Sequence, residues 1–209
     1  MYFVIDVICA VDRPRVIQFW KKHLQTLTGC NGFVAAEFFL RQQDLRNADY
    51  DFLLLYQWRD AEACRQALWQ GAMPAQVPGQ QIERAYYEIA IELAKAQAAD
   101  EHSSWLINPF EITVEQMPDV LDMWDKAKDH MQAKAGFQHA RLLRATHANA
   151  RYGLVNVAQW QSAEHFIAAL DDKAYDRHKQ RSLQYQLHPS LCKRLALVPA
   201  DTAAASCIA

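Results

Sequence analysis

The first residues whose types and spacing suggest chemistry are a tyrosine and a histidine in the last third of the chain. His178 follows Tyr175 by three positions, so both side chains would share one face of a helix. A histidine there could act as a general base or bind haem iron as an axial ligand. Its neighbours Asp176, Arg177 and Lys179 leave a second interpretation open, a solvated histidine on a charged helix face.

Asn156 is a polar residue inside an apolar segment. It stands between Val155 and Val157, and an internal alignment of the chain puts Leu54 at the corresponding position. Burying an amide in place of leucine costs free energy unless the amide is hydrogen-bonded. Asn156 is therefore either satisfied by the fold or kept for a ligand. We predict that His178 and Asn156 are the catalytic residues.

Aromatic residues near these positions could hold a flat ligand. Trp58 and Trp160 each end an expected strand and could stack on such a ligand. The alternative is a structural role in the core, where tryptophan is often highly buried. Together with Phe166 and Tyr175, the two tryptophans are the predicted substrate-binding residues.

An internal duplication indicates which elements position these side chains. Residues 108–170 align with residues 4–68, and the shared residues at an offset of 104 are Pro14/Pro118, Trp20/Trp124, Lys22/Lys126 and Gly32-Phe33/Gly136-Phe137. At an offset of 102 the pairs are Tyr50/Tyr152, Gln57-Trp58/Gln159-Trp160 and Ala61-Glu62/Ala163-Glu164. Two copies at so long a period indicate a duplicated domain. We expect domains at 1–93 and 107–199, a linker at 94–106 and a disordered tail at 200–209.

Each copy has the pattern βαββαβ. The strands expected in the first copy are 2–11, 34–41, 51–58 and 86–93, with helices beginning at Asp12 and Asp60, residues that favour helix N-caps. The second copy is expected to have strands 109–115, 138–145, 152–159 and 191–198 and helices 118–134 and 162–184. This order is that of a ferredoxin-like unit. The fold class is thus α+β, with the two units packed sheet on sheet.

Composition argues against several classes of partner. The 22 Lys and Arg against 24 Asp and Glu give a net charge of −2, so no basic surface points to nucleic acid or to a membrane. The five cysteines contain no C-x-x-C pair, and no apolar run approaches the roughly 18 residues of a membrane span. No dinucleotide, P-loop, zinc-protease or hydrolase motif occurs. We expect a cytoplasmic protein without a metal site.

The chain resembles members of the antibiotic biosynthesis monooxygenase superfamily that carry two copies of the domain in tandem. The residues that carry the resemblance are the Gly-Phe pairs, the strands ending in tryptophan and the helices opening Asp-Ala-Glu or Ser-Ala-Glu, above all in 159–166 and 175–179. The resemblance implies two fused ferredoxin-like repeats that form a pseudo-dimeric α+β barrel.

The resemblance also implies two kinds of chemistry. Anthrone monooxygenases of the family need neither metal nor flavin and hold an electron-rich aromatic substrate in an apolar cavity. Haem-degrading members carry an Asn on the first strand and a Trp and a His on the second helix. The corresponding positions here are Glu111 or Val7 for the Asn and Ala169 for the Trp, while His178 lies one residue early.

We therefore predict a cofactor-independent monooxygenase that oxidises a small aromatic or quinol-like compound with dioxygen. Its pocket should lie between the helices and the sheet of the second repeat, near Asn156, Trp160 and His178. The alternatives are a haem-degrading enzyme, and a non-catalytic protein that binds haem or a hydrophobic metabolite. The expected partners are a small hydrophobic or aromatic ligand and, besides the internal pseudo-dimer, a further homo-oligomer.

Overall fold

The computed structural model describes residues 1–74, 77–94, 103–171 and 176–201, with the side chains of 177–179 outside the description. It divides into two compact units, each of which combines antiparallel strands with helices, so the expected α+β class is confirmed. Unit 1 comprises Met1–Leu40, Asp49–Glu88 and Arg194–Ala209, and unit 2 comprises Arg41–Ala48 and Ile89–Lys193. The predicted domain ranges stay a prediction. Most of the expected linker (95–102) and of the expected tail (202–209) lie outside the described residues.

Unit 1 is built from the first half of the chain and its last strand. Its elements are β1 (Tyr2–Ala10), α1 (Arg13–Gln25), most of β2 (Phe33–Asp44), β3 (Phe52–Trp58), α2 (Ala61–Trp69), the first part of β4 (Gln80–Ala94) and the end of β9 (Ser190–Pro199). The strand order is β4-β1-β3-β2-β9. Asp12 and Asp60 cap the two helices as expected, accepting hydrogen bonds from the backbone N of Arg15 (3.1 Å) and of Ala63 (2.8 Å).

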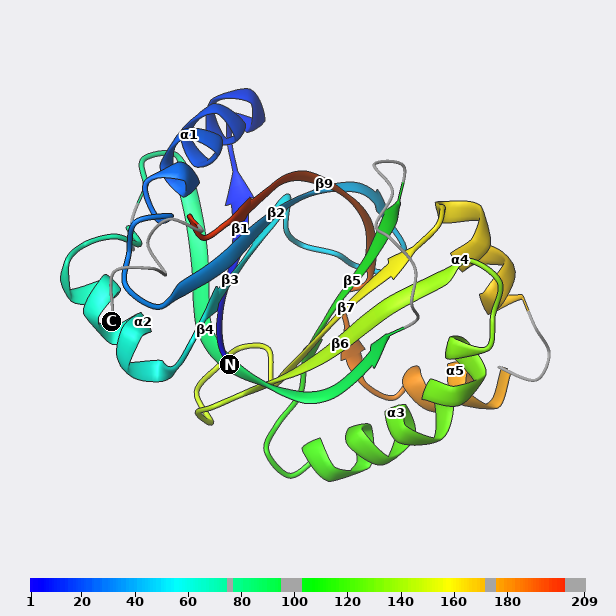
Figure 1. Ribbon diagram of the computed structural model, residues 1–209. Helices are drawn as coiled ribbons and strands as arrows, with labels where there is room; N and C mark the ends of the chain where they lie inside the picture. The colour runs from blue at the N-terminus through cyan, green and yellow to red at the C-terminus, as the bar shows by residue number, and fades with distance from the viewer. Residues whose placement is uncertain (75–76, 95–102, 172–175, 202–209) are drawn as a thin grey trace. The chain divides into compact units, whose positions relative to one another are not determined.

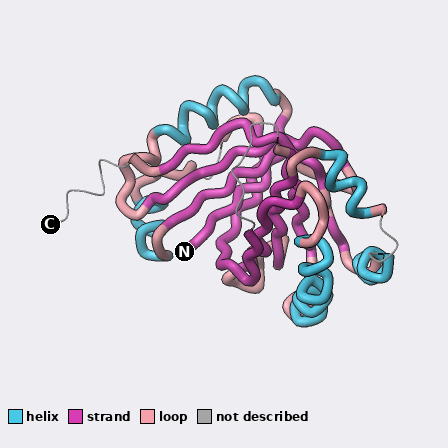
Figure 2. Tube along the Cα trace, turned by 45° about the vertical axis from the view of Figure 1, so that its right-hand side comes forward, coloured by secondary structure: helices cyan, strands magenta, loops and turns pink. Residues whose placement is uncertain are grey.

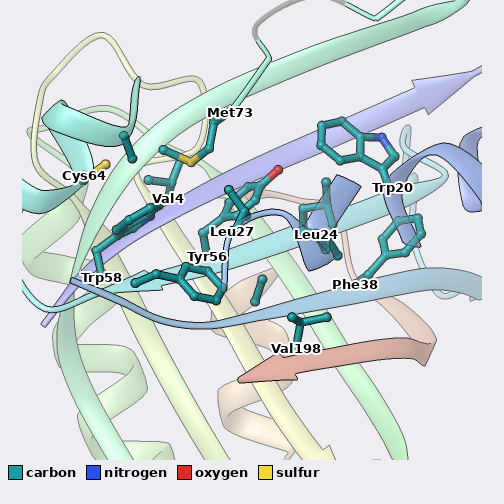
Figure 3. Packing of buried hydrophobic residues seen from close by; sticks show 14 of the residues in the cluster. Val4, Trp20, Leu24, Leu27, Phe38, Tyr56, Trp58, Cys64, Met73 and Val198 are labelled. Carbon is teal, nitrogen blue, oxygen red and sulfur yellow. The ribbon is translucent and has the colours of Figure 1, made fainter. Parts of the chain in front are cut away.

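The core of unit 1 is filled by large side chains between its helices and one face of its sheet. Trp20, Leu24, Tyr56 and Trp58 are all fully buried there, and Figure 3 shows them packed together with Met73 from the segment that follows α2. Burial of such side chains is the main driving force for folding.

Unit 2 contains the second half of the chain. Its elements are β5 (Ser104–Glu111), α3 (Met117–Gln132), β6 (Phe137–Ala145), β7 (Leu154–Trp160), α4 (Ala163–Leu170), α5 (Asp176–Ser182), β8 (Gln186–Leu187) and the start of β9. The strand order is β4-β6-β7-β5, and β5 also pairs with β8 and β9. In each unit the helices lie outside the strands (Figures 1 and 2). No helix in the described part of the chain is long and apolar enough to cross a membrane.

The largest differences from the expected boundaries concern three elements. The first strand of unit 2 was expected at 109–115 but β5 spans Ser104–Glu111, and β4 begins six residues before the expected start at 86. Polar residues such as Ser104 and Gln80 open these strands, and they do not favour strand by type. The single helix expected at 162–184 is two helices, because Asp171 is the C-cap of α4 and α5 begins at Asp176.

The shared Gly-Phe pairs form the same turn in both units. Gly32 and Gly136 have φ of +76° and +78°, a conformation that favours glycine. Their carbonyl oxygens accept hydrogen bonds from the backbone N of Arg59 (2.8 Å) and of Gln161 (2.7 Å). Each turn thereby ties the strand that follows the first helix to the start of the second helix, which explains why both halves carry it.

Candidate active site

Unit 2 contains a partly enclosed cavity of about 260 Å³ between its helices and its sheet. The floor is formed by β5, β6 and β7, and the walls by α3, α4 and the end of α5. Most of the lining is apolar, including Leu106, Phe110, Met123, Met131, Phe137 and Phe166. For scale, an apolar cavity of about 150 Å³ binds benzene. This cavity therefore suits a flat molecule of one or two rings.

Two asparagines lie side by side on the floor of the cavity. Asn108 on β5 and Asn156 on β7 are direct partners in the antiparallel register. The Oδ1 atoms of both side chains are buried and have no hydrogen-bond partner. Buried polar atoms are nearly always hydrogen-bonded, so such a pair calls for an explanation. Two unpartnered acceptors at the floor of an apolar cavity are an arrangement that a ligand with hydrogen-bond donors would complete.

Unit 1 has a polar group in the equivalent register, and there it is satisfied. Asp6 on β1 lies opposite Leu54 on β3, as Asn108 lies opposite Asn156. Arg84 donates to both oxygens of the Asp6 carboxylate at 2.6 Å, and the hydroxyl of Tyr56 donates to Oδ2 at 3.1 Å. Burial and the nearby Asp6 charge raise the pKa of Tyr56 well above its ordinary value, so its hydroxyl stays a donor.

A change of side-chain size helps to explain why unit 2 is hollow at this level. Tyr56 stands two residues beyond Leu54 on β3, is fully buried and fills the space between sheet and helices. The residue two positions beyond Asn156 on β7 is Ala158, which lines the cavity. An alanine in place of a tyrosine leaves room for roughly one aromatic ring at this level of the sheet.

Trp160 and Phe166 form one wall of the cavity. The Trp160 ring is 1% exposed and meets the rings of Phe137 and Phe166 edge to face, with centroids 5.4 and 5.5 Å apart. Its indole Nε1 is buried without a hydrogen-bond partner. Trp58, the other predicted ligand-stacking tryptophan, is packed in the core of unit 1 against Phe33 and is not part of the cavity lining.

The cationic side chains that line the cavity already have partners. Arg46 donates from Nη2 to the backbone oxygen of Tyr185 at 2.7 Å. Lys128 forms an ion pair with Asp125, and that hydrogen bond and charge raise the pKa of Lys128, which therefore keeps its proton. None of the described lining residues on β5, β6 and β7 is charged, so the strands contribute no charge to the cavity floor.

The structure thus brings Asn156, Trp160 and Phe166 together around one cavity; their roles stay predictions. His178 lies on α5, whose last residue Ser182 lines the cavity, but the side chain of His178 is outside the description, and Tyr175 lies outside the described residues.

Asn108 was missed by the sequence reasoning. The expected strand began at residue 109, one residue after Asn108. The residue compared with the first-strand asparagine of the haem-degrading proteins was Glu111. Alternation along the strand is the signal that could have found it, because Leu106, Asn108 and Phe110 share one face.

The described residues offer no evident place for a metal or for haem. Among them no three His, Cys, Asp or Glu side chains gather as a metal site. The described cavity lining contains no imidazole, thiolate or phenolate, and the haem-ligand types that it does contain are the thioethers of Met123 and Met131. A porphyrin is also several times larger than benzene, so the cavity as it stands does not fit haem.

No family model and no curated protein matches the sequence. Solved structures do match over nearly the whole chain. An anthrone oxidase-like protein has a TM-score of 0.73 at 14% identity, covering 95% of this chain and 93% of its own. A candidate monooxygenase from Fusobacterium nucleatum has a TM-score of 0.66 at 9% identity, with the same coverage. A major regulator of staphylococcal pathogenesis has a TM-score of 0.57 at 10% identity, covering 93% of this chain and 99% of its own.

These similarities confirm an α+β fold that monooxygenase-like proteins share, while the two fused repeats of the expected barrel stay a prediction. Monooxygenase-like proteins are among the neighbours over about 95% of the chain. The same fold also occurs in a regulator. Fold alone does not determine function, so activity must be argued from the cavity.

Proposed function

We propose that this protein is a cofactor-independent monooxygenase that oxidises a small aromatic or quinol-like compound with dioxygen in the cavity of unit 2. We further propose that the chain is two fused ferredoxin-like repeats, a pseudo-dimeric α+β barrel, of which only the second retains a site. The observation that carries the proposal is the pair of unpartnered acceptors, Asn108 and Asn156, on the floor of an apolar cavity. The fold shared with an anthrone oxidase-like protein supports it.

The reaction needs no reductant beyond the substrate. A ring methylene next to an electron-rich aromatic system is oxidised to a carbonyl: the carbon loses two C–H bonds and gains a double bond to one oxygen atom. The second oxygen atom leaves as water with the two hydrogens. The substrate supplies all four electrons that dioxygen accepts.

In this mechanism the protein orients the substrate and assists its ionisation. Asn156 accepts a hydrogen bond from a substrate hydroxyl, which increases the electron density of the ring and favours electron release to dioxygen. His178 is the proposed general base. The wall formed by Trp160 and Phe166 packs against the ring system of the substrate and excludes water, and the exclusion of water strengthens these polar interactions.

The test is dioxygen uptake with a panel of quinols and anthrones in the presence of a metal chelator. His178→Ala should lower turnover by roughly 10²–10⁴-fold, and Asn156→Leu by at least about tenfold. Phe137→Leu, which changes a cavity wall, should alter KM. Its matched control is Phe33→Leu, the same change at the Gly-Phe turn of unit 1, which should leave KM unchanged. Equal effects of the two phenylalanine variants, or a loss under threefold for His178→Ala, would count against the proposal.

One observation favours a second candidate function, non-catalytic binding of a hydrophobic metabolite. No carboxylate or imidazole lines the cavity among the side chains that the structure describes, so a base is absent from that part of the lining. Stoichiometric binding of an aromatic ligand without dioxygen uptake or product would identify a binding protein.

A further inference from the structure

The two cavity asparagines together specify more about the ligand than either does alone. Asn108 and Asn156 face each other across β5 and β7, so their Cβ atoms are about 4.5–5.5 Å apart. Both Oδ1 atoms are buried and lack partners. The floor therefore presents two neighbouring acceptors, and the remaining lining around them is mostly apolar.

Resting on the proposed function, we infer that Asn108 and Asn156 form a two-point acceptor subsite that selects aromatic ligands with two hydroxyl groups on one edge of the ring system. Two hydroxyl groups on neighbouring carbons of one edge could each donate a hydrogen bond to one of the two Oδ1 atoms, which lie side by side. A ligand with one hydroxyl would leave one buried acceptor unpaired. A ligand with only acceptors, such as the corresponding quinone, would leave both Oδ1 atoms unpaired and could pair only with the Nδ2 groups of the two amides. Sites built to hydrogen-bond a hydroxyl discriminate strongly against analogues that lack it.

Unit 1 supports this interpretation through its contrast with unit 2. There the polar group in the equivalent register, Asp6, receives three hydrogen bonds from Arg84 and Tyr56. The fold thus supplies partners to a buried acceptor at this register when no ligand is needed. In unit 2 the residue that would correspond to Tyr56 is Ala158, which removes the donor and leaves space in its place.

The subsite also makes Asn108 a specificity-determining residue. Asn156 and Asn108 each present one acceptor, so removing either should abolish recognition of the second hydroxyl. The apolar contacts of the ligand with Trp160 and the helices should persist. The effect of the substitution should consequently depend on the number of hydroxyl groups that the ligand carries.

The experiment is isothermal titration calorimetry of the full chain without dioxygen. The probes are naphthalene, naphthol with one hydroxyl, and the naphthalenediol with two hydroxyls on adjacent carbons. The diol should bind roughly tenfold or more tightly than naphthol. Asn108→Leu, which keeps the number and branching of the side-chain heavy atoms, should remove that advantage and leave naphthalene binding within about twofold, as a double-mutant cycle between residue and hydroxyl requires. Asn156→Leu provides the same test if the first variant does not fold.

The outcomes separate this inference from the proposed function. Diol selectivity that depends on Asn108, with no dioxygen uptake, would support the subsite and overturn the monooxygenase. Equal affinity for diol and naphthol, tighter binding of the quinone, or an equal loss for all three probes in Asn108→Leu would overturn the subsite, even if dioxygen uptake were observed.

Discussion

At the residue scale, the site is defined by polar atoms that the fold does not satisfy. The buried Asn156 amide replaces what is Leu54 in the equivalent register of unit 1, and its Oδ1 has no partner. An unsatisfied buried acceptor costs about 1–3 kcal/mol. A protein that keeps this cost in one unit and avoids it in the other has given up stability at the place where a ligand would bind.

Asn156→Leu should therefore stabilise the protein in the absence of ligand. We expect the free energy of unfolding to rise by about 1 kcal/mol, because the unpaired acceptor is replaced by an apolar group of similar shape that the cavity has room for. Chemical denaturation of both proteins measures it. The matched control is Leu54→Asn in the filled core of unit 1, which should lower the free energy of unfolding by about 2 kcal/mol or more. A clear loss of stability in Asn156→Leu would show that the amide has a structural partner.

Sequence reasoning at this scale predicted three residues that line the cavity, Asn156, Trp160 and Phe166, and their roles stay predictions. Asn156 was predicted because a polar residue interrupts an apolar strand, and Trp160 because it ends an expected strand and could stack on a flat ligand. Trp58 also ends an expected strand, but it lies in the core of unit 1. A residue that both halves share is explained by the fold that they share and need not contact a ligand. Asn108 could not be found without the register that places it opposite Asn156.

At the element scale, the two Gly-Phe turns connect strand and helix through backbone geometry. A Cβ added at Gly136 would lie 2.4 Å from Cγ and 2.5 Å from Cβ of His165, besides the strain of a φ of +78°. At Gly32 the corresponding contact is with Cβ of Ala63, also at 2.4 Å. The Cβ atoms of His165 and Ala63 are fixed by the backbones of α4 and α2 and cannot rotate away, so both turns need glycine for close approach as well as for φ.

Gly136→Ala should be more destabilising than the same change at a glycine that has only the φ constraint. Gly71, with φ of +72° and no atom within 4 Å of an added Cβ, is the matched control. We expect about 1–2 kcal/mol for Gly71→Ala and at least about 1 kcal/mol more for Gly136→Ala, because α4 must shift. Thermal or urea denaturation compares them. Similar values for the two variants would mean that α4 adapts without cost.

Helix and strand order could be predicted from periodicity and capping, as Asp12 and Asp60 illustrate. The starts of β4 and β5 could not, because Gln80 and Ser104 are placed in strands by pairing with β1 and β7, not by their own preference. The end of α4 was missed because Ala and Leu around residue 170 favour helix, while Asp171 in fact caps it. The hollow in unit 2 depends on small differences in side-chain size that no periodicity records.

At the scale of the whole molecule, the two units have equivalent strand registers, but the interior of unit 1 is filled by side chains and that of unit 2 contains a cavity. In unit 1 Tyr56 fills the space above the sheet, and its hydroxyl satisfies Asp6. In unit 2 Ala158 leaves a cavity above Asn108, whose acceptor is unpaired. A single substitution copied from unit 1 should therefore fill part of the interior of unit 2.

Ala158→Tyr should raise Tm and abolish ligand binding. The added ring fills part of the cavity, and its hydroxyl can donate to Asn108 as Tyr56 donates to Asp6. We expect a Tm increase of a few degrees, since about 1 kcal/mol corresponds to roughly 2–4 °C for a chain of this size. Ala158→Phe is the matched control: it also blocks the cavity but lacks the hydroxyl, so it should stabilise less. Calorimetric scans of the three proteins, with titration of the naphthalenediol, measure both effects. A tyrosine variant that melts below the phenylalanine variant would show that the added hydroxyl does not donate to Asn108. Unchanged affinity of the tyrosine variant for the diol would show that the cavity is not where the ligand binds.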